Sequence, residues 1–354
     1  MKAGFISLLA MVFALNSCDF DSKLYQPAGI AVTGKVGEIL VVCDQDLWDS
    51  EIKQMLDSNL TQFIMPYFPD VATFDLIHKT PAHFTEGVKR YRNTLFLSID
   101  PKLSGDKGKI EKRIGVWATD QLVIEVIGKD YNQLVETCKY GLRNVHEEFD
   151  TMEWERILKY YKQTPNGSID QALKKNFGIK MALPDAAKLV TSRTNFFRIE
   201  FPSAARPIEF VGSGQQDAGT IFSGLTVYQY DYTDSSQFSM ESLLQARDTM
   251  LKYNVPYSYE GMYMGTQYTK MVYPEGNPSI NQSGKLKVFE MRGMFVFTGL
   301  GKHGPGGCFW SYHFIQPKTK KLVCVSGYVD APSTASWTQP LREVEAILKS
   351  VEID

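Results

Sequence analysis

The stretch Cys308–Val329, CFWSYHFIQPKTKKLVCVSGYV, contains two apolar and aromatic runs on either side of the polar turn Pro317–Lys320. Strand-forming runs joined by a short polar turn are typical of a β-hairpin. With Pro317–Lys320 as the loop, His313 lies opposite Cys324. This hairpin predicts that the C-terminal part of the chain forms an antiparallel sheet.

The two faces of this hairpin differ, because side chains alternate between the faces along each strand. One face is apolar and aromatic and is expected to be core: Trp310, Tyr312, Phe314, Val323 and Val325. The other face mixes aromatic and polar side chains: Phe309, Ser311, His313, Cys324, Ser326 and Tyr328. We interpret the mixed face as a candidate binding groove with Phe309, His313 and Tyr328 as contact residues. A face covered by a helix, or simply solvated, is the alternative.

A second candidate surface precedes the hairpin along the chain. The segment 257–268 reads as a strand in which Tyr257, Tyr259 and Tyr263 share parity, so their rings are expected to line one face. Such a row can anchor a protein partner or stack on sugars. Packing against neighbouring strands is the alternative, because strands favour Tyr.

Strand and helix patterns alternate in the rest of the chain. Strands are expected at 38–43, 74–77, 94–99 and 121–127, and helices are expected near 83–91, from Asp46, from Asp130 and from a capping box of Asp150 and Glu153. A turn-rich break follows at 163–185. We therefore expect an α+β protein with two lobes of mixed or antiparallel sheet packed with helices. An N-terminal α+β lobe is expected over 35–165, and a C-terminal antiparallel lobe with a terminal helix over 185–354.

The first residues carry an export signal. Met1-Lys2 precedes the apolar run Gly4–Leu15, which is far shorter than the roughly 20 residues of a membrane-spanning helix. The following Leu15-Asn16-Ser17-Cys18 resembles the bacterial lipobox, in which the thiol of the Cys takes a thioether-linked glyceride. We expect that residues 1–17 are removed, that lipid is attached to Cys18, and that 18–34 form a tether.

The expected anchor places the protein in the cell envelope. Two or three acyl chains hold a protein firmly to a bilayer, whereas one chain holds it weakly. We expect the outer membrane as the location. Another membrane of the envelope is the alternative, and the sequence does not indicate the leaflet.

Composition narrows the classes of partner and chemistry. The chain has 38 Lys and Arg against 40 Asp and Glu and no basic cluster, so no nucleic-acid partner is expected. HExxH, GxSxG and CxxC are absent from the sequence, so we expect no metal and no cofactor and assign no catalytic residue. Gly299, Gly301 and Gly304 spell GxGxxG, but a strand pattern follows instead of a helix, which indicates a connector.

Four cysteines remain beside Cys18. Cys43 ends an apolar strand and Cys138 lies on an apolar helix face, so both are expected to be buried thiols. In the hairpin register, Cys308 and Cys324 lie about 16 Å apart, which is too far for a disulfide.

Several segments suggest a family. With the lipobox, they are Gly37–Val42, Trp48, Tyr91–Thr94, Trp117–Val123 and Glu153–Arg156. They resemble the exported lipoproteins grouped as domain-of-unknown-function family 4837, over nearly the whole mature chain. This resemblance implies anchoring and supplies neither catalytic residues nor a substrate.

The second lobe looks like the α/β/α sandwich of PsbP and Mog1 proteins, with Phe196–Pro202 as first strand and Leu341–Val351 as closing helix. That likeness implies a protein-binding accessory module. The expected function is therefore a membrane-anchored, non-catalytic binding or accessory subunit of an envelope complex with a protein partner. A glycan-binding lipoprotein is the second hypothesis, and an envelope hydrolase is the third.

Overall fold

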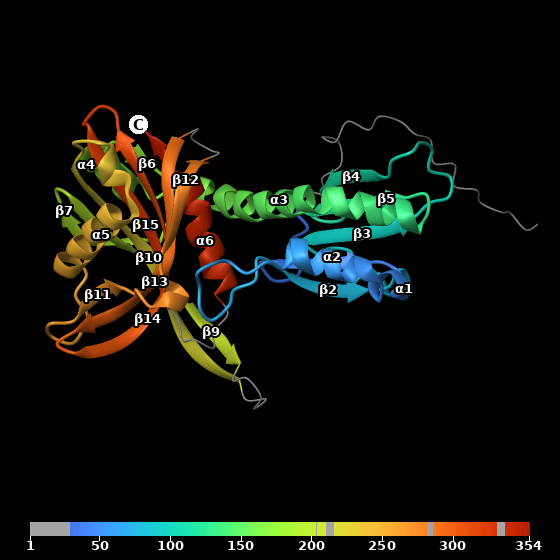
Figure 1. Cartoon of the computed structure of the whole chain (residues 1–354), viewed down its shortest axis with the longest axis horizontal. Helices are drawn as coiled ribbons and strands as arrows, with labels where there is room; N and C mark the ends of the chain where they lie inside the picture. Colours follow the sequence, from blue (N-terminus) through green and yellow to red (C-terminus); the bar gives the residue numbers. More distant parts are fainter. Residues whose placement is uncertain (1–28, 203, 210–215, 282–285, 331–336) are drawn as a thin grey trace, which may run out of the picture.

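The computed structural model of the chain describes residues 29–202, 204–209, 216–281, 286–330 and 337–354. It has two lobes, and the long helix α3 (Tyr131–Gln163) runs from one lobe to the other (Figure 1). The lipid attachment predicted at Cys18 and the export signal predicted over residues 1–17 lie outside the described residues. In the described part of the chain, no helix is both long and apolar enough to cross a membrane.

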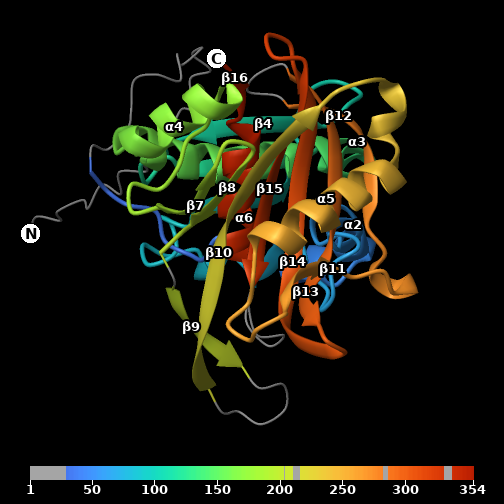
Figure 2. The ribbon, with the colours of Figure 1, turned by 90° about the vertical axis from the view of Figure 1, so that its left-hand side faces the viewer.

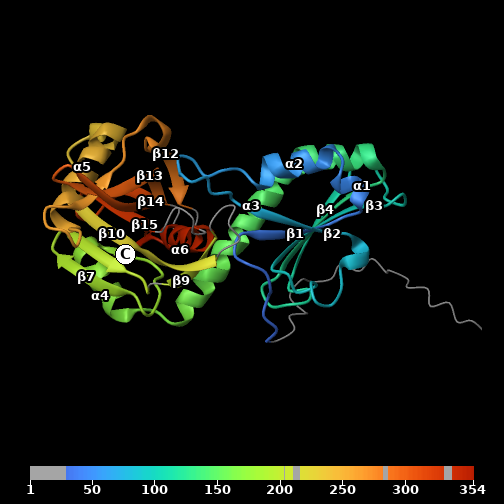
Figure 3. The same ribbon diagram turned by 90° about the horizontal axis from the view of Figure 1, so that it is seen from below.

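The first lobe is built on a five-stranded sheet of order β2-β1-β3-β5-β4, in which only β4 is antiparallel. Its elements are β1 (Glu38–Val42), α1 (Gln45–Trp48), α2 (Glu51–Leu60), β2 (Asp75–Lys79), the 3-10 helix η1 (Pro81–His83), β3 (Asn93–Ile99), β4 (Lys109–Ile114) and β5 (Leu122–Gly128). Apolar side chains of α2 and α3 pack together on one face of this sheet (Figure 3).

The second lobe is built on a nine-stranded sheet of order β11-β13-β14-β15-β10-β8-β7, with β12 paired to β13 and β9 paired to β10. Its strands are β7 (Lys188–Arg193), β8 (Phe196–Glu200), β9 (Ala204–Glu209), β10 (Gln216–Asp231), β11 (Tyr263–Thr266), β12 (Glu275–Asn281), β13 (Leu286–Gly299), β14 (Lys302–Gln316) and β15 (Lys321–Asp330). The short strands β6 (Ile179–Lys180) and β16 (Glu352–Ile353) form a separate pair.

Helices cover both faces of this curved sheet. They are α4 (Gly167–Phe177), α5 (Met240–Asn254) and α6 (Thr338–Lys349), with the 3-10 helices η2 (Ser235–Phe238) and η3 (Lys270–Val272) in connections. Figure 2 shows α5 in front of the sheet and α6 behind it. The α4 and α6 side chains join one apolar cluster, and those of α5 join another on the opposite face. The expected α+β architecture is therefore confirmed.

The hairpin register predicted from the sequence is confirmed. His313 pairs with Cys324 and Cys308 pairs with Val329. Cys43, Cys138, Cys308 and Cys324 are all buried free thiols.

The capping box predicted at Asp150 and Glu153 is wrong, because α3 continues unbroken through both residues. Each carboxylate has another role. Glu153 accepts hydrogen bonds from Arg92 at 2.7 and 2.8 Å, and Asp150 pairs with Arg342 of α6. These acidic side chains therefore stabilise tertiary contacts of α3 instead of starting a helix.

Two other local predictions are wrong. The helix expected from Asp46 is split into α1 and α2, and Ser50 caps α2 by accepting a hydrogen bond from the Ile52 amide. The helix expected near 83–91 is only the single turn η1.

The two lobes meet in a buried interface. Arg342 donates to the carbonyl oxygen of Thr73 at 2.8 Å, and its guanidinium lies 4.9 Å from the centre of the Phe74 ring. Tyr67 of the first lobe enters the core of the second, where its hydroxyl donates to the Phe309 carbonyl at 3.1 Å. These contacts fix the 61–74 loop of the first lobe against the second lobe.

Candidate binding site

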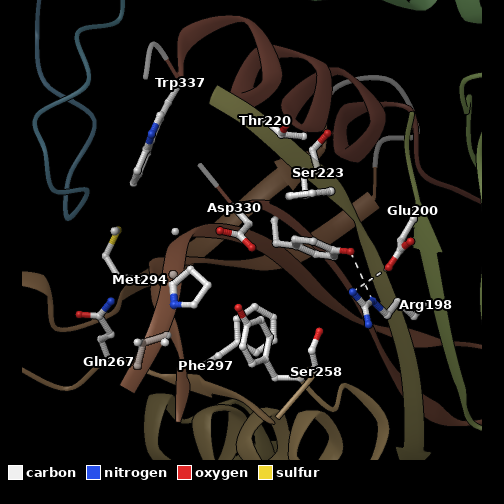
Figure 4. A pocket seen from close by; sticks show the side chains of 18 of the residues that line it. Arg198, Glu200, Thr220, Ser223, Ser258, Gln267, Met294, Phe297, Asp330 and Trp337 are labelled. Carbon is white, nitrogen blue, oxygen red and sulfur yellow. Dashed lines mark hydrogen bonds and ion pairs between the residues drawn. The ribbon is translucent and has the colours of Figure 1, made fainter. Parts of the chain in front are cut away.

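A cavity of about 800 Å³ lies where β15 ends at Asp330. Its walls come from β8, β10, β13, β14 and the turn after α5, and Trp337, which precedes α6, also lines it (Figure 4). Phe68 and Pro69 of the first lobe also line it. The cavity is thus built by both lobes, and the buried Tyr67 holds the loop that supplies the first lobe's share.

Strand geometry places the polar side chains of the cavity. Arg198 and Glu200 are two residues apart on β8, so they share a face. Gly224 on β10 pairs with Glu200 on one side and with Tyr328 on the other. A Cβ at residue 224 would lie 2.9 Å from the Tyr328 hydroxyl. The missing side chain therefore leaves space for the Tyr328 ring beside Arg198.

The charges in the cavity do not balance. Arg198 pairs with Glu200 at 2.7 Å and donates to the Tyr328 hydroxyl at 3.4 Å. Asp330 makes neither an ion pair nor a side-chain hydrogen bond with the described residues. Burial raises the pKa of Asp330 to about 6, although the nearby Arg198 acts in the opposite direction. At neutral pH, one guanidinium faces two carboxylates.

Aromatic and apolar side chains form most of the remaining wall. The Tyr257 ring stacks on Phe297 with centroids 4.5 Å apart, and Met294, Phe222 and Trp337 also line the cavity. Gln267 and Ser258 add polar groups beside these rings (Figure 4). An apolar wall with a few fixed polar groups is typical of a small-ligand or side-chain binding site.

The sequence placed Tyr257, Tyr259 and Tyr263 on one strand, and this is wrong. The chain turns at 258–261, and only Tyr263 belongs to β11. Tyr257 lines the cavity, and Tyr259 is 68% exposed beside it. Tyr263 faces a separate shallow pocket near Lys252. The turn therefore separates the third ring from the other two.

The mixed face of the hairpin is not an open groove, because α5 covers it. Phe309 and His313 are fully buried. The Arg247 guanidinium of α5 lies 3.6 Å from the Phe309 ring centre and donates to Ser326 at 3.2 Å. Of the three hairpin residues proposed as contacts, only Tyr328 lines the cavity.

The groups under α5 are held in neutral forms, with Arg247 as the exception. Burial lowers the pKa of His313 to about 3 and raises the pKa of Cys324 to about 12. A neutral thiol beside a neutral imidazole is a poor nucleophile pair. The described residues also contain no group of three or more His, Cys, Asp and Glu positioned to hold a metal ion.

Sequence reasoning missed Arg198, Glu200, Asp330, Phe68 and Trp337 as cavity residues. The alternation of side chains in the strand pattern Phe196–Pro202 does place Arg198 and Glu200 on one face, so the sequence carries a signal for these two. Pro332 and the Ser and Thr that follow it do mark a strand end in the sequence, but no local pattern indicates that a loop of the other lobe packs there.

Two family models divide the chain. The model of a domain of unknown function, DUF4837, matches residues 166–350, and a second such model, DUF8532, matches residues 32–162. The residues that suggested the first family in the sequence lie mainly between 37 and 156, in the stretch matched by the second model. No curated protein sequence matches the chain.

Two solved structures of Mog1 are distantly similar. The Saccharomyces cerevisiae Ran-binding protein Mog1p has a TM-score of 0.28 and 10% sequence identity, over 50% of this chain and 90% of Mog1p. A point mutant of Mog1 has a TM-score of 0.25 with the same identity and coverage.

Proposed function

We propose that this chain, which belongs to the DUF4837 family, is a membrane-anchored, non-catalytic binding protein that holds part of an envelope protein in the cavity between its lobes. Export by residues 1–17, lipid on Cys18 and a location at the outer membrane are parts of this proposal that rest on the sequence. In this account the protein is an accessory subunit of an envelope complex.

The observation that carries the proposal is the construction of the cavity. Its volume of about 800 Å³ accommodates several side chains, and it combines rigid aromatic walls with a small set of charged groups. Tyr257 and Phe297 already stack on each other, so little side-chain freedom is lost when a ligand packs on them. Rigid aromatic residues in a concave site are frequent centres of binding energy.

Partner capture by cavity variants tests the proposal. Two variants change the cavity lining. Phe68→Asp replaces an apolar side chain that is 57% exposed with a charged one, and Tyr257→Ala removes an aromatic ring from the wall. Tyr140→Ala on the outer face of α3, where Tyr140 is 72% exposed, is the matched control. Lipidated protein is isolated from membranes in mild detergent, and co-purifying proteins are identified by mass spectrometry.

Both cavity variants should lose a partner that the wild type and Tyr140→Ala retain, while their thermal midpoints stay close to that of the wild type. Retention of the same partners by all variants would place the binding surface elsewhere. A collapse of the midpoint in Tyr257→Ala would show that this ring is structural, and Phe68→Asp then decides the question because its side chain is more exposed.

The anchor has its own test. Cys18→Ala should abolish labelling by palmitate and release the protein from the membrane fraction, because no other thiol occupies the lipobox position. Ser17→Ala, which keeps a small residue before the cysteine, is the control. Continued labelling of Cys18→Ala contradicts the anchor.

Glycan binding is the second candidate. It is favoured by the presence of the Tyr257 ring in the same cavity lining as Gln267, Ser258 and Asp330, since sugars are bound by stacking together with hydrogen bonds. Soluble fragments of envelope glycans should then bind the wild type and fail to bind Tyr257→Ala. This result, together with no captured protein partner, favours glycan binding over protein binding.

A further inference from the structure

We infer that the cavity takes a cationic group on an apolar stem, namely the ammonium or guanidinium of a lysine or arginine side chain of the protein partner. This inference rests on the proposed function and names the chemistry of its ligand. It comes from the charges, the aromatic walls and the size of the cavity.

The charges come first. Arg198 is already paired with Glu200 at 2.7 Å, so its charge is offset. The Asp330 carboxylate remains in the same wall without an ion-pair partner among the described residues. In Figure 4, this carboxylate lies between the side chains of Phe297 and Trp337. A half-buried carboxylate loses part of its hydration, and this cost is offset when a cation or hydrogen-bond donors reach it. An incoming cation therefore gains more here than an anion or a neutral group.

The aromatic walls favour the same ligand. The faces of Tyr, Phe and Trp rings attract ammonium and guanidinium groups, and the attraction is stronger when water is excluded. Tyr257, Phe297 and Trp337 line the same cavity as Asp330. Figure 4 shows Phe297 and Trp337 on opposite sides of the Asp330 carboxylate. The same rings offer apolar contact to the methylene stem of a lysine or arginine. A carboxylate backed by aromatic rings thus suits a charged head on an apolar stem.

Size and position favour a side chain of a protein over a free amine. The cavity volume of about 800 Å³ exceeds that of one ammonium group several times over, and Phe68 and Phe222 extend apolar surface outward from its wall. A partner segment fills this space with the residues on either side of its cation. Both phenylalanines are largely exposed and available for such contacts.

Methyl NMR on the full non-lipidated chain provides the test, with ¹³C-methyl methionine as the label and Met294 as the reporter in the cavity wall. Met294→Leu assigns its signal. The probes are phenethylammonium, its neutral analogue 2-phenylethanol and the anion 3-phenylpropionate. We expect phenethylammonium to shift the Met294 signal with a Kd about tenfold lower than that of 2-phenylethanol, and the anion to bind least.

Asp330→Asn should remove the preference for the ammonium over the alcohol, whereas Asp231→Asn, at the exposed far end of β10, should leave it intact. The preference should also fall below about pH 6, because burial raises the pKa of Asp330 to about 6. Among the described residues, Arg198 and Tyr328 interact electrostatically with Asp330, and Glu200, the ion-pair partner of Arg198, lines the same cavity. Equal binding of alcohol and ammonium, or tighter binding of the anion, overturns the inference.

A second pair of probes separates the sources of the cation. Blocked tripeptides with a central lysine or arginine should shift the Met294 signal, and short-chain phosphatidylethanolamine should not. Binding of the lipid alone overturns the assignment to a protein side chain. Failure here is distinguishable from failure of the proposed function: a partner still captured through Phe68 and Tyr257 without any cation preference refutes only the inference. A cation preference without cavity-dependent capture refutes the proposed function.

Discussion

The second lobe buries polar side chains in two places that behave differently. Under α5, Arg247 is packed on Phe309 and His313 is held neutral, with no opening to solvent. At the end of β15, Asp330 lines an open cavity and has neither an ion pair nor a side-chain hydrogen bond among the described residues. Both sets lie on the same sheet. The difference is that α5 covers the first set of side chains and leaves the second set facing a cavity.

A substitution in the polar cluster that α5 covers, which contains Arg247 and His313, should have the largest effect on the free energy of unfolding. Arg247→Ala removes a buried guanidinium that packs on Phe309 and hydrogen bonds to Ser326 and Thr266. The loss of packing and of these hydrogen bonds should lower the free energy of unfolding by about 3 kcal/mol. Urea denaturation measures this loss in the free energy of unfolding. Lys252→Ala, on the exposed side of the same helix, should change it by less than about 0.5 kcal/mol; equal losses would show that Arg247 is not specially placed.

Removing the charge of Asp330 in the open cavity should have the opposite effect and raise the free energy of unfolding. The folded-state pKa of Asp330 is about 6 against 3.8 for the free group, so the folded chain binds the proton more tightly. Stability therefore falls as the pH rises through this range. Asp330→Asn should stabilise the protein by about 1 to 2 kcal/mol near pH 7.5, allowing for screening of a half-buried carboxyl, with the gain shrinking towards pH 4.

Asp231→Asn is the control for this measurement and should leave stability unchanged at both pH values, because Asp231 is exposed. A loss of stability in Asp330→Asn at neutral pH contradicts an unpaired carboxylate. A gain combined with lost ligand binding indicates that the residue is kept for function at a cost in stability.

These two regions also show what the sequence could and could not predict. The hairpin register followed from a local turn and strand parity, and it is confirmed at His313 and Cys324. The sequence left open whether a helix covers the other face of the hairpin, because α5 is distant from the hairpin along the chain. The structure shows that α5 covers it, so Phe309 and His313 are buried and are not contact residues of a groove. The cavity depends on the loop around Phe68 of the other lobe, and a contact between lobes leaves no periodic pattern in the sequence.

A smaller effect should distinguish the cavity wall from the core. Tyr257 is partly exposed and stacks on Phe297, so Tyr257→Ala should cost about 1 kcal/mol. Phe309→Ala, on the sealed face, should cost about 3 kcal/mol or more. Comparable losses in thermal or urea unfolding would place Tyr257 in the core.

The smallest expected effect is a difference in thiol alkylation between the native and the denatured protein. Burial raises the pKa of Cys324 to about 12, so this thiol should resist alkylation in the native state near pH 8. After denaturation without reductant, non-lipidated protein lacking Cys18 should be alkylated at all four remaining cysteines, which are free thiols. Modification of only two, or of none, contradicts the absence of disulfides, and rapid native labelling of Cys324 contradicts the sealing by α5.

Photo-crosslinking tests the central claim, that the open cavity is the binding surface, most directly. Benzoylphenylalanine is placed at Phe222 in the cavity wall in one sample and at Tyr140 on the exposed face of α3 in another. Irradiation of intact cells should give the same discrete adduct repeatedly from position 222, and the additional Tyr257→Ala change should abolish it. An adduct of equal yield from position 140, or one from 222 that survives Tyr257→Ala, contradicts the account.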